Sequence, residues 1–236
     1  MNADQDYYLK DRKKHLRFCN TLIKGGEKAL YAYDDQVFAE EFKKEVPIEF
    51  GLLLPHIPYV GGQEPWTKQL LLTAWFIAAY KWMKKKGEPL DKTWKLCSDM
   101  LEMRLRKLPK IMRRIMRYSI FTRKQKKIYA KQAVASRDKI YPEGDVFDFK
   151  DTNNGFDYTI EITECAKMTF AKKTGAMEFM PYICLIDKLW AEIFNYGLVR
   201  KGTLADGFEK CDFNLKKEGK VDVYSAVWVD EWDNRC

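Results

Sequence analysis

Apolar and polar side chains alternate along the stretch Phe156-Asp157-Tyr158-Thr159-Ile160-Glu161-Ile162-Thr163-Glu164. Alternation with a period of two predicts a strand that buries one face and leaves the other in solvent. A shorter run of the same kind, Val146-Phe147-Asp148-Phe149, precedes it, and residues 151–155 between the two runs are turn-forming. We therefore predict two strands joined by a turn.

The chain beyond these strands predicts two helices and then two more strands. The expected helices are 165–173 and 180–196, and the expected strands are 198–204 and 211–217, joined as a hairpin around Ala205-Asp206-Gly207. This ββααββ order predicts an α+β fold, in which helices cover an antiparallel sheet.

Residues 1–140 are expected to form a mainly helical region. The expected helices are 6–24, which Gly25-Gly26 ends, then 27–44, 67–86 and 88–107, and a basic helix after Pro109. Between Pro47 and Gly62 we expect a long irregular segment that is apolar and therefore packed. The helical region packs on the α+β region of residues 141–236, and the two are expected to form one compact domain.

Composition limits the class of protein. The chain has 236 residues, of which 46% are hydrophobic, so it can bury a sizeable core and is not disordered. Its N-terminus is polar and shows no secretory signal, and the apolar run from Leu70 to Tyr80 is too short to span a bilayer. We therefore expect a cytoplasmic protein without a membrane partner.

The six cysteines are expected to be unpaired thiols. No export signal accompanies them, and no CxxC pair occurs, which argues against a zinc ribbon or a redox dithiol. The chain has only two histidines, so a histidine-rich metal site is excluded.

The net charge of +8 is unevenly placed, because residues 104–131 hold twelve Lys or Arg and no acidic residue. Ile111 and Ile115 recur there at helical spacing among the basic residues. The favoured interpretation is a solvated helix face, and a phosphate backbone or a membrane surface is the alternative. No RNA- or DNA-binding motif accompanies the run, so we do not expect a nucleic-acid partner.

Cys165 and the adjacent Glu164 form the first candidate pair. Cys165 lies where a strand is expected to pass into a helix, and a helix N-terminus stabilises a thiolate and lowers the thiol pKa. Glu164 is a candidate base or orienting group. The alternative is a buried structural cysteine.

Further candidates follow along the chain. Cys184 and Asp187 are three residues apart on one expected helix and would share a face. Cys211 lies on a strand, with its side chain opposite in direction to that of Asp212. Arg200 offers a forked donor for a substrate carboxylate, or else pairs with Asp187 or Asp212.

The order and spacing of several short motifs carry a resemblance. They are Ile57-Pro58-Tyr59-Val60-Gly61-Gly62 before the apolar helix, Phe156-Asp157-Tyr158, Thr163-Glu164-Cys165, Cys184-Leu185-Ile186-Asp187, the run 198–207 and Cys211-Asp212-Phe213. Together they resemble the L-2-amino-thiazoline-4-carboxylic acid hydrolase family over roughly residues 45–217. The C-terminal half is also similar to 4-vinyl reductase domains, which bind small molecules.

The first resemblance implies a hydrolase that opens a small cyclic isothiourea or amide-like substrate to an N-carbamoyl amino acid. The implied catalytic residues are Cys165 as the nucleophile, Asp187 as the general acid or base, and Glu164. The implied substrate-binding residues are Arg200, Thr203, His56, Tyr158, Cys184, Cys211, Gly61 and Gly62. The loop from Pro55 to Gly62 is expected to close one side of the pocket.

Two matters stay open at this point. No cofactor or metal is expected, although a zinc ion held by three thiolates and Asp187 is an alternative. A non-catalytic domain that senses a small ligand or a metal is the competing function, and a homo-oligomer is left open.

Overall fold

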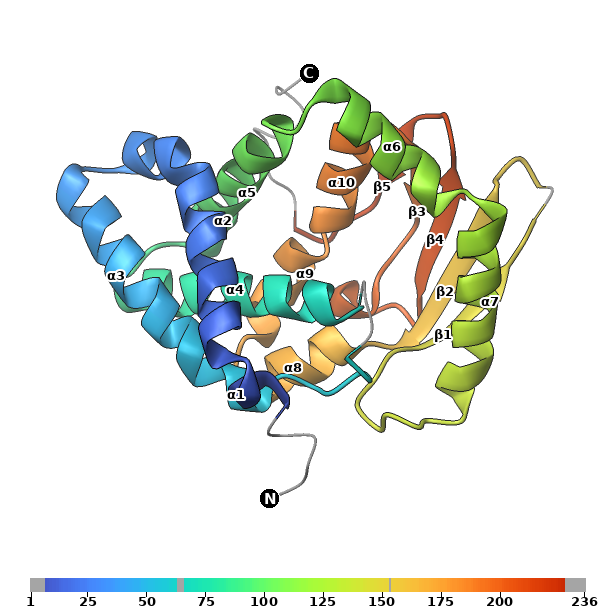
Figure 1. The fold of residues 1–236 in the computed structure, drawn as a ribbon, viewed down its shortest axis with the longest axis horizontal. Helices are drawn as coiled ribbons and strands as arrows, with labels where there is room; N and C mark the ends of the chain where they lie inside the picture. The colour runs from blue at the N-terminus through green and yellow to red at the C-terminus, as the bar shows by residue number, and fades with distance from the viewer. Residues whose placement is uncertain (1–6, 63–65, 153, 228–236) are drawn as a thin grey trace.

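The helices and strands follow the expected division of the chain (Figure 1). The computed structural model describes residues 7–62, 66–152 and 154–227. The N-terminal part contains α1 (Tyr7–Lys10), α2 (Arg12–Tyr33), α3 (Gln36–Leu53), η1 (Leu54–His56), α4 (Trp66–Lys85), α5 (Leu90–Arg106), α6 (Lys110–Ile120) and α7 (Arg123–Arg137). The C-terminal part contains β1 (Val146–Lys150), β2 (Tyr158–Glu164), α8 (Ala166–Thr174), η2 (Met177–Phe179), α9 (Met180–Ile183), α10 (Ile186–Phe194), β3 (Gly197–Arg200), η3 (Leu204–Asp206), β4 (Cys211–Lys216) and β5 (Val221–Val223).

The sheet confirms the α+β class and adds one strand. Its order is β1-β2-β4-β3-β5, and all neighbours are antiparallel except β5, which runs parallel to β3. The four predicted strands pair antiparallel as expected, whereas β5 and its parallel pairing at this edge were not predicted. A three-residue strand has too little sequence pattern to be recognised, and its pairing with β3 defines it.

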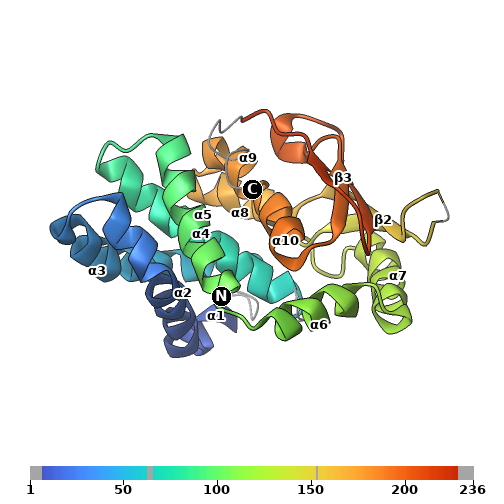
Figure 2. The same cartoon turned by 90° about the horizontal axis from the view of Figure 1, so that it is seen from above.

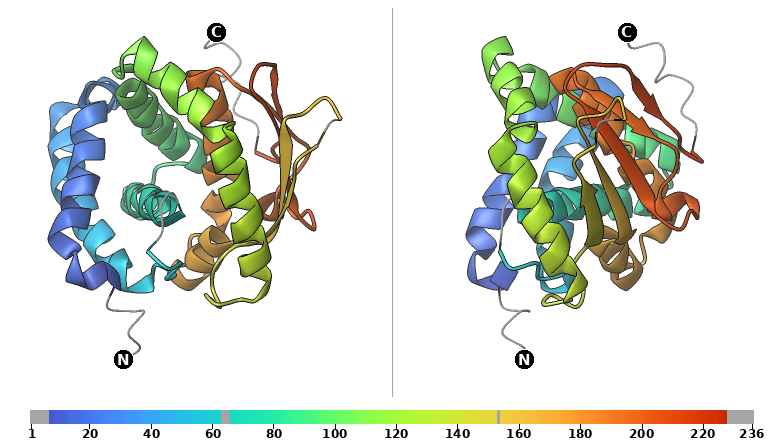
Figure 3. Two further views of the ribbon diagram at one scale, coloured as in Figure 1. Left: turned by 45° about the vertical axis from the view of Figure 1, so that its right-hand side comes forward. Right: turned by 90° about the vertical axis from the view of Figure 1, so that its right-hand side faces the viewer.

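Helices cover one face of this sheet. The ring of Tyr129 on α7 lies 6.1 Å from that of Phe149 and 5.9 Å from that of Tyr158, while Ala191 of α10 packs in the same buried cluster. Figure 2 shows α10 between α5 and the sheet, and Figure 3 shows α6 and α7 running along the sheet's side. The opposite face carries charges, where Glu161 pairs with both Lys150 and Lys210.

Helix α2 runs through Gly25 and Gly26, which the sequence predicted as its end. A Cβ on Gly26 would lie 2.4 Å from Cβ of Met100, so only glycine allows α2 and α5 to pack this closely. The helix ends instead near Asp34. Asp35 caps the next helix by accepting a hydrogen bond from the Phe38 N–H.

Two other boundaries differ from the prediction. Pro47 lies inside α3, so the irregular segment begins only after η1. The expected single helix 180–196 is interrupted at Cys184 and Leu185, which lie between α9 and α10. Cys184 and Asp187 therefore do not share one helix, although the break leaves both near Arg200.

Among the described residues, no helix is long and apolar enough to cross a membrane.

Candidate active site

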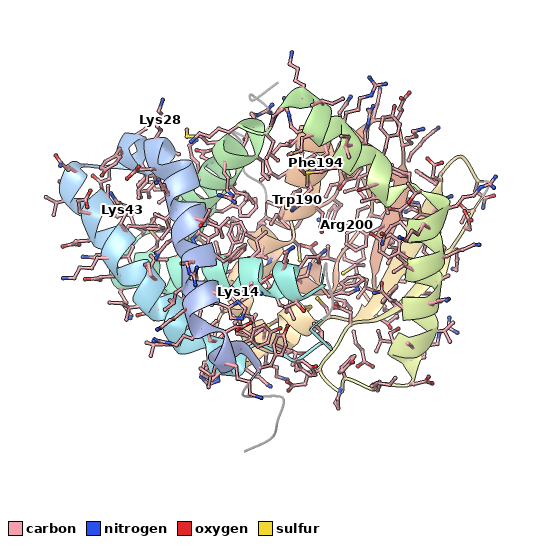
Figure 4. All side chains as sticks on the ribbon, in the orientation of Figure 1. Lys14, Lys28, Lys43, Trp190, Phe194 and Arg200 are labelled. Carbon is pink, nitrogen blue, oxygen red and sulfur yellow. The ribbon has the colours of Figure 1, made fainter. Side chains whose placement is uncertain are left out.

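A cavity of about 550 Å³ lies between the helical part and the sheet. Its walls are mostly aliphatic and aromatic. The helical part contributes Phe18, Leu22, Leu72 and Leu101, and the other side contributes Tyr158, Ile160, Trp190, Phe194, Leu198 and Phe213. Figure 4 shows Trp190 and Phe194 in the region between α5 and α6.

Three charged side chains from the C-terminal part line this cavity: Asp145, Lys167 and Asp187. We call them the charged cluster. Asp145 precedes β1, Lys167 lies in the first turn of α8, and Asp187 lies in the first turn of α10. Three separate segments thus bring two carboxyl groups and one amine to the same apolar cavity.

Arg200 binds the side chain of Asp187 from outside the cavity. The Arg200 side chain is fully buried, and its Nη1 donates to Asp187 Oδ2 at 2.8 Å and to the Cys184 carbonyl at 2.7 Å. Its guanidinium lies over the ring of Phe213. Arg200 is thus paired with Asp187, one of the two partners that the sequence suggested, and it does not line the cavity; its role as a carboxylate anchor stays a prediction.

Lys167 is the electrostatic centre of the charged cluster. Burial disfavours its ammonium form, but the charge of Asp187 and, where they are ionised, those of Cys165 and Asp145 outweigh burial and raise its pKa. Lys167 therefore stays protonated at neutral pH and places a fixed positive charge beside both carboxyl groups.

Asp145 lies in a different environment from that of Asp187. Its Oδ1 accepts a hydrogen bond from the Ala166 N–H at 2.9 Å, and the thiol of Cys165 is its side-chain partner. Burial raises the pKa of Asp145, although Lys167 and these hydrogen bonds act in the opposite direction. The cluster thus contains one carboxyl group with a raised pKa and one ion-paired carboxylate.

Cys165 stands at the predicted position, as the residue that precedes α8. The predicted lowering of its pKa is wrong. Burial, followed by the charge of Asp145, raises the pKa to about 12, against the favourable effects of Lys167 and of the Met168 amide. Cys165 is half-buried and is not among the residues that line the cavity.

The other two cysteines of the constellation lie nearby but are also protonated. Burial raises the pKa of Cys184 to about 12 and that of Cys211 to about 11. The Sγ of Cys211 accepts a hydrogen bond from the Leu204 N–H at 3.2 Å. The five described cysteines are unpaired, and Cys236 lies outside the described residues.

Two further predicted site residues, Thr203 for substrate binding and Glu164 for catalysis, have partners within the protein. The buried Thr203 exchanges hydrogen bonds with Asp206 and caps η3. Glu164 is exposed and pairs with Lys139 at 2.6 Å. Tyr158 does line the cavity.

The loop of residues 55–62 contacts α8 through η1, yet it contributes no cavity wall. His56 is exposed. A Cβ on Gly61 would lie 2.4 Å from the hydroxyl of Tyr141, and one on Gly62 would lie 2.8 Å from that of Tyr7. These glycines therefore admit neighbouring tyrosine rings, and the expected closure of the pocket by this loop is not seen.

Sequence reasoning missed Lys167 and Asp145. A weak signal existed for Lys167, because a lysine in the first turn of a helix opposes the helix dipole and calls for a compensating reason. Asp145 sits in a turn-like sequence, where aspartate is common for local reasons. Its importance comes from Ala166 and Cys165, which are distant in sequence.

In the described part of the chain, no three His, Cys, Asp or Glu side chains come together in a group that could hold a metal ion. Whether the protein uses a cofactor stays a prediction.

The fold is α+β, and a mostly apolar cavity between its two parts is lined by two carboxyl groups and one amine. A family model described as L-2-amino-thiazoline-4-carboxylic acid hydrolase matches residues 68–215. The match spans more than half of the chain and includes the whole charged cluster, so the protein belongs to this family. Comparisons with curated proteins and with solved structures gave no match. The likeness to 4-vinyl reductase domains stays a prediction.

Proposed function

We propose that the protein is a hydrolase that adds water to the amidine-like carbon of a small cyclic substrate, such as 2-amino-thiazoline-4-carboxylate. The observation that carries this proposal is the charged cluster, in which two carboxyl groups in different environments flank one ammonium group inside an apolar cavity. Pairs of acids whose environments differ in this way supply the acid and the base of a reaction.

The reaction divides among the three side chains. The Asp187 carboxylate takes one proton from water and passes it to the ring nitrogen, while the oxygen bonds to the ring carbon that carries sulfur and two nitrogens. The carbon–sulfur bond then breaks as Asp145 gives its proton to the leaving sulfur, and Asp145 regains a proton from the new hydroxyl group, which becomes the carbonyl. Lys167 stabilises the negative charge that develops during the addition and on the leaving sulfur. The product is an N-carbamoyl amino acid with a free thiol.

Cys165 offers a second route, as the nucleophile itself. Asp145 would take the thiol proton and Lys167 would stabilise the thiolate, before water releases the product. We favour direct attack by water, because Asp187 lines the cavity and Cys165 does not. Replacement of Cys165 by serine separates the two routes. Direct attack predicts that Cys165→Ser keeps turnover within about tenfold, whereas a nucleophile predicts a loss of about 100-fold or more.

Basic residues of the helical part are the proposed partners of the substrate carboxylate. Arg104, Arg117 and Lys68 line the cavity. A guanidinium binds a carboxylate through two parallel hydrogen bonds. Arg104 and Arg117 are therefore better candidates than Arg200, because they line the cavity and Arg200 does not.

The deciding experiment measures thiol release from 2-amino-thiazoline-4-carboxylate by the wild type, Asp187→Asn and Asp148→Asn. Asp148 pairs with Arg137 on the surface and provides a matched control for an aspartate paired with an arginine. We expect a loss of at least about 100-fold for Asp187→Asn, the usual scale for a general base, and none for Asp148→Asn. Equal turnover by all three proteins would refute the proposed role of Asp187.

A second candidate function is binding without turnover, and the mostly apolar cavity wall favours it. Such a domain would bind its ligand equally well when its cysteines are replaced by serine, and it would release no product. A cytoplasmic location also stays a proposal.

A further inference from the structure

The cavity is larger than the family's namesake substrate requires. Its volume of about 550 Å³ falls within the range of pockets that hold drug-sized ligands. The namesake substrate is one small ring with an amino and a carboxyl substituent. Bound at the charged cluster, it would leave much of the cavity unfilled.

The rest of the wall suits an apolar group. Leu72, Leu101 and Leu198 line it from three different elements. Trp190 and Phe194 add a stacked aromatic pair with ring centroids 5.1 Å apart. Water beside these apolar side chains lacks hydrogen-bond partners, so an apolar occupant is favoured in that part of the cavity.

We propose that the natural substrate is an amphiphile, in which an isothiourea- or amidine-like group carries an alkyl or aromatic body. The polar group lies at the charged cluster, where the oxygens of two carboxyl groups accept hydrogen bonds from the amidine N–H groups. The apolar body fills the space between Leu101 and Leu198. The placement of the reacting group rests on the proposed function.

Calorimetric titration with S-methyl-, S-butyl- and S-octylisothiourea tests this proposal, because the head group is constant and only the chain grows. We expect affinity to rise at least about tenfold from S-methyl to S-octyl, since each buried methylene contributes favourably. Leu101→Trp should weaken binding of the octyl compound about tenfold and leave the methyl compound unchanged. Leu52→Trp, at an exposed leucine of α3, should change neither.

Equal affinity for all three compounds would overturn the proposal, and this arm needs no variant. Should Leu101→Trp fail to fold by circular dichroism, Leu72→Trp replaces it. The result also separates the two proposals. If affinity rises with chain length and Asp187→Asn keeps full turnover, only the proposed hydrolytic role of the charged cluster is refuted. Hydrolysis of the small ring without chain-length dependence would refute only the substrate class.

A second inference comes independently from α6, which turns its apolar side toward solvent. None of its residues is buried. Its large exposed apolar side chains are Ile111 at 64%, Met112 at 47%, Ile115 at 61% and Met116 at 38%. Arg113 and Arg117 are half-buried instead, and Arg117 Nη1 donates to the Asn195 carbonyl at 2.9 Å. The expected solvated basic face is thus partly turned inward.

The surrounding charge identifies the kind of surface that α6 fits. Residues 104–131 contain twelve Lys or Arg and no acid, and Lys110 and Arg114 are exposed beside the apolar side chains. A second copy would bring two such basic segments together, which charge repulsion opposes. A nucleic acid would leave Ile111 and Ile115 uncovered by apolar groups. An anionic lipid surface satisfies both the charge and the apolar face.

We infer that α6 docks the protein on an anionic bilayer surface, with Ile111 and Ile115 inserted among the lipids. Such peripheral contact requires no spanning helix. Helix α6 also forms part of the cavity wall through Met116 and Ile120, so docking would bring the cavity close to the lipids.

Co-sedimentation with vesicles tests this inference. We expect binding to vesicles of phosphatidylcholine and phosphatidylglycerol, little binding to phosphatidylcholine alone, and weakening with salt. Ile111→Asp and Ile115→Asp should each reduce binding about tenfold, whereas Ile48→Asp, at an exposed isoleucine of α3, should not. Absence of binding by the wild type, equal loss with Ile48→Asp, or a dimer in light scattering that Ile111→Asp dissociates would each overturn it.

Discussion

The two parts of the molecule treat buried polar groups differently. Among the described residues, the buried polar side chains of the helical part are hydroxyls and His15, whose pKa burial lowers. The C-terminal part buries the guanidinium of Arg200 and surrounds Lys167 with acids. Buried charge is costly, so a fold that needs only a core avoids it. The contrast supports the proposed division, in which the helical part is mainly scaffold and cavity wall and the C-terminal part carries the proposed acid–base groups.

The largest expected effect is on stability, from a change in the scaffold. Trp75 is fully buried on α4 and is not a cavity residue. We expect Trp75→Ala to lower the free energy of unfolding by about 3–5 kcal/mol, the usual loss for a buried aromatic side chain. Urea unfolding measures this, and KM of the folded enzyme should not change. Val37→Ala, at an exposed residue, is the control. A large change in KM with Trp75→Ala would break the division between scaffold and site.

The next effect is on catalysis, from Lys167. We expect Lys167→Met to reduce kcat/KM at least about 100-fold, equivalent to about 2.7 kcal/mol, because it removes the charge that stabilises the addition. Lys173→Met on the same helix is the matched control, since Lys173 pairs with Glu143 near the surface. If both variants retained wild-type turnover, Lys167 would be a structural lysine and the charged cluster would not be the site.

The last effect concerns the reactivity of Cys165 as a function of pH, and it leaves stability and turnover unchanged. Because burial raises its pKa to about 12, the thiolate fraction should rise about tenfold per pH unit from pH 7 to 10. Alkylation of Cys165 by iodoacetamide, followed by peptide mass spectrometry, should therefore accelerate across this range without levelling off.

Asp145→Asn supplies the control for that titration. Removal of the neighbouring negative charge should lower the thiol pKa and speed alkylation at pH 8, since Asp145 is one of the causes of the raised value. A rate in the wild type that levels off below pH 8 would instead restore the original expectation of an activated nucleophile.

Local pattern was sufficient for much of the fold. Alternation identified β1 and β2, and the turn residues after them placed the later helices and strands within a few residues. The features that local sequence pattern did not predict depend on contacts between segments that are distant in the chain. The sequence at Gly26 predicts a helix end, but in the structure this glycine allows close packing against Met100 within a continuous helix. Strand β5 is defined only by its pairing with β3.

Some residues of the candidate site were likewise predictable from the sequence, and others were not. Asp187 was identified because a carboxylate on a mostly buried helix needs a partner, and that partner is Arg200. The reactivity of Cys165 was misjudged, because the sequence shows the helix N-terminus but not the burial that outweighs it. The proposed role of Asp145 depends on its tertiary neighbours Ala166 and Cys165, and no local pattern reveals a cavity shared by segments so far apart.

The most direct test of the central claim is a crystal structure with S-butylisothiourea, whose head group mimics the reacting centre of the substrate. We predict its amidine group within hydrogen-bonding distance of the Asp187 or Asp145 carboxyl group, beside Lys167, with the butyl chain directed toward Leu101 and Leu198. Density for the compound beside His56 and the Gly61-Gly62 turn, with the charged cluster unoccupied, would contradict the account.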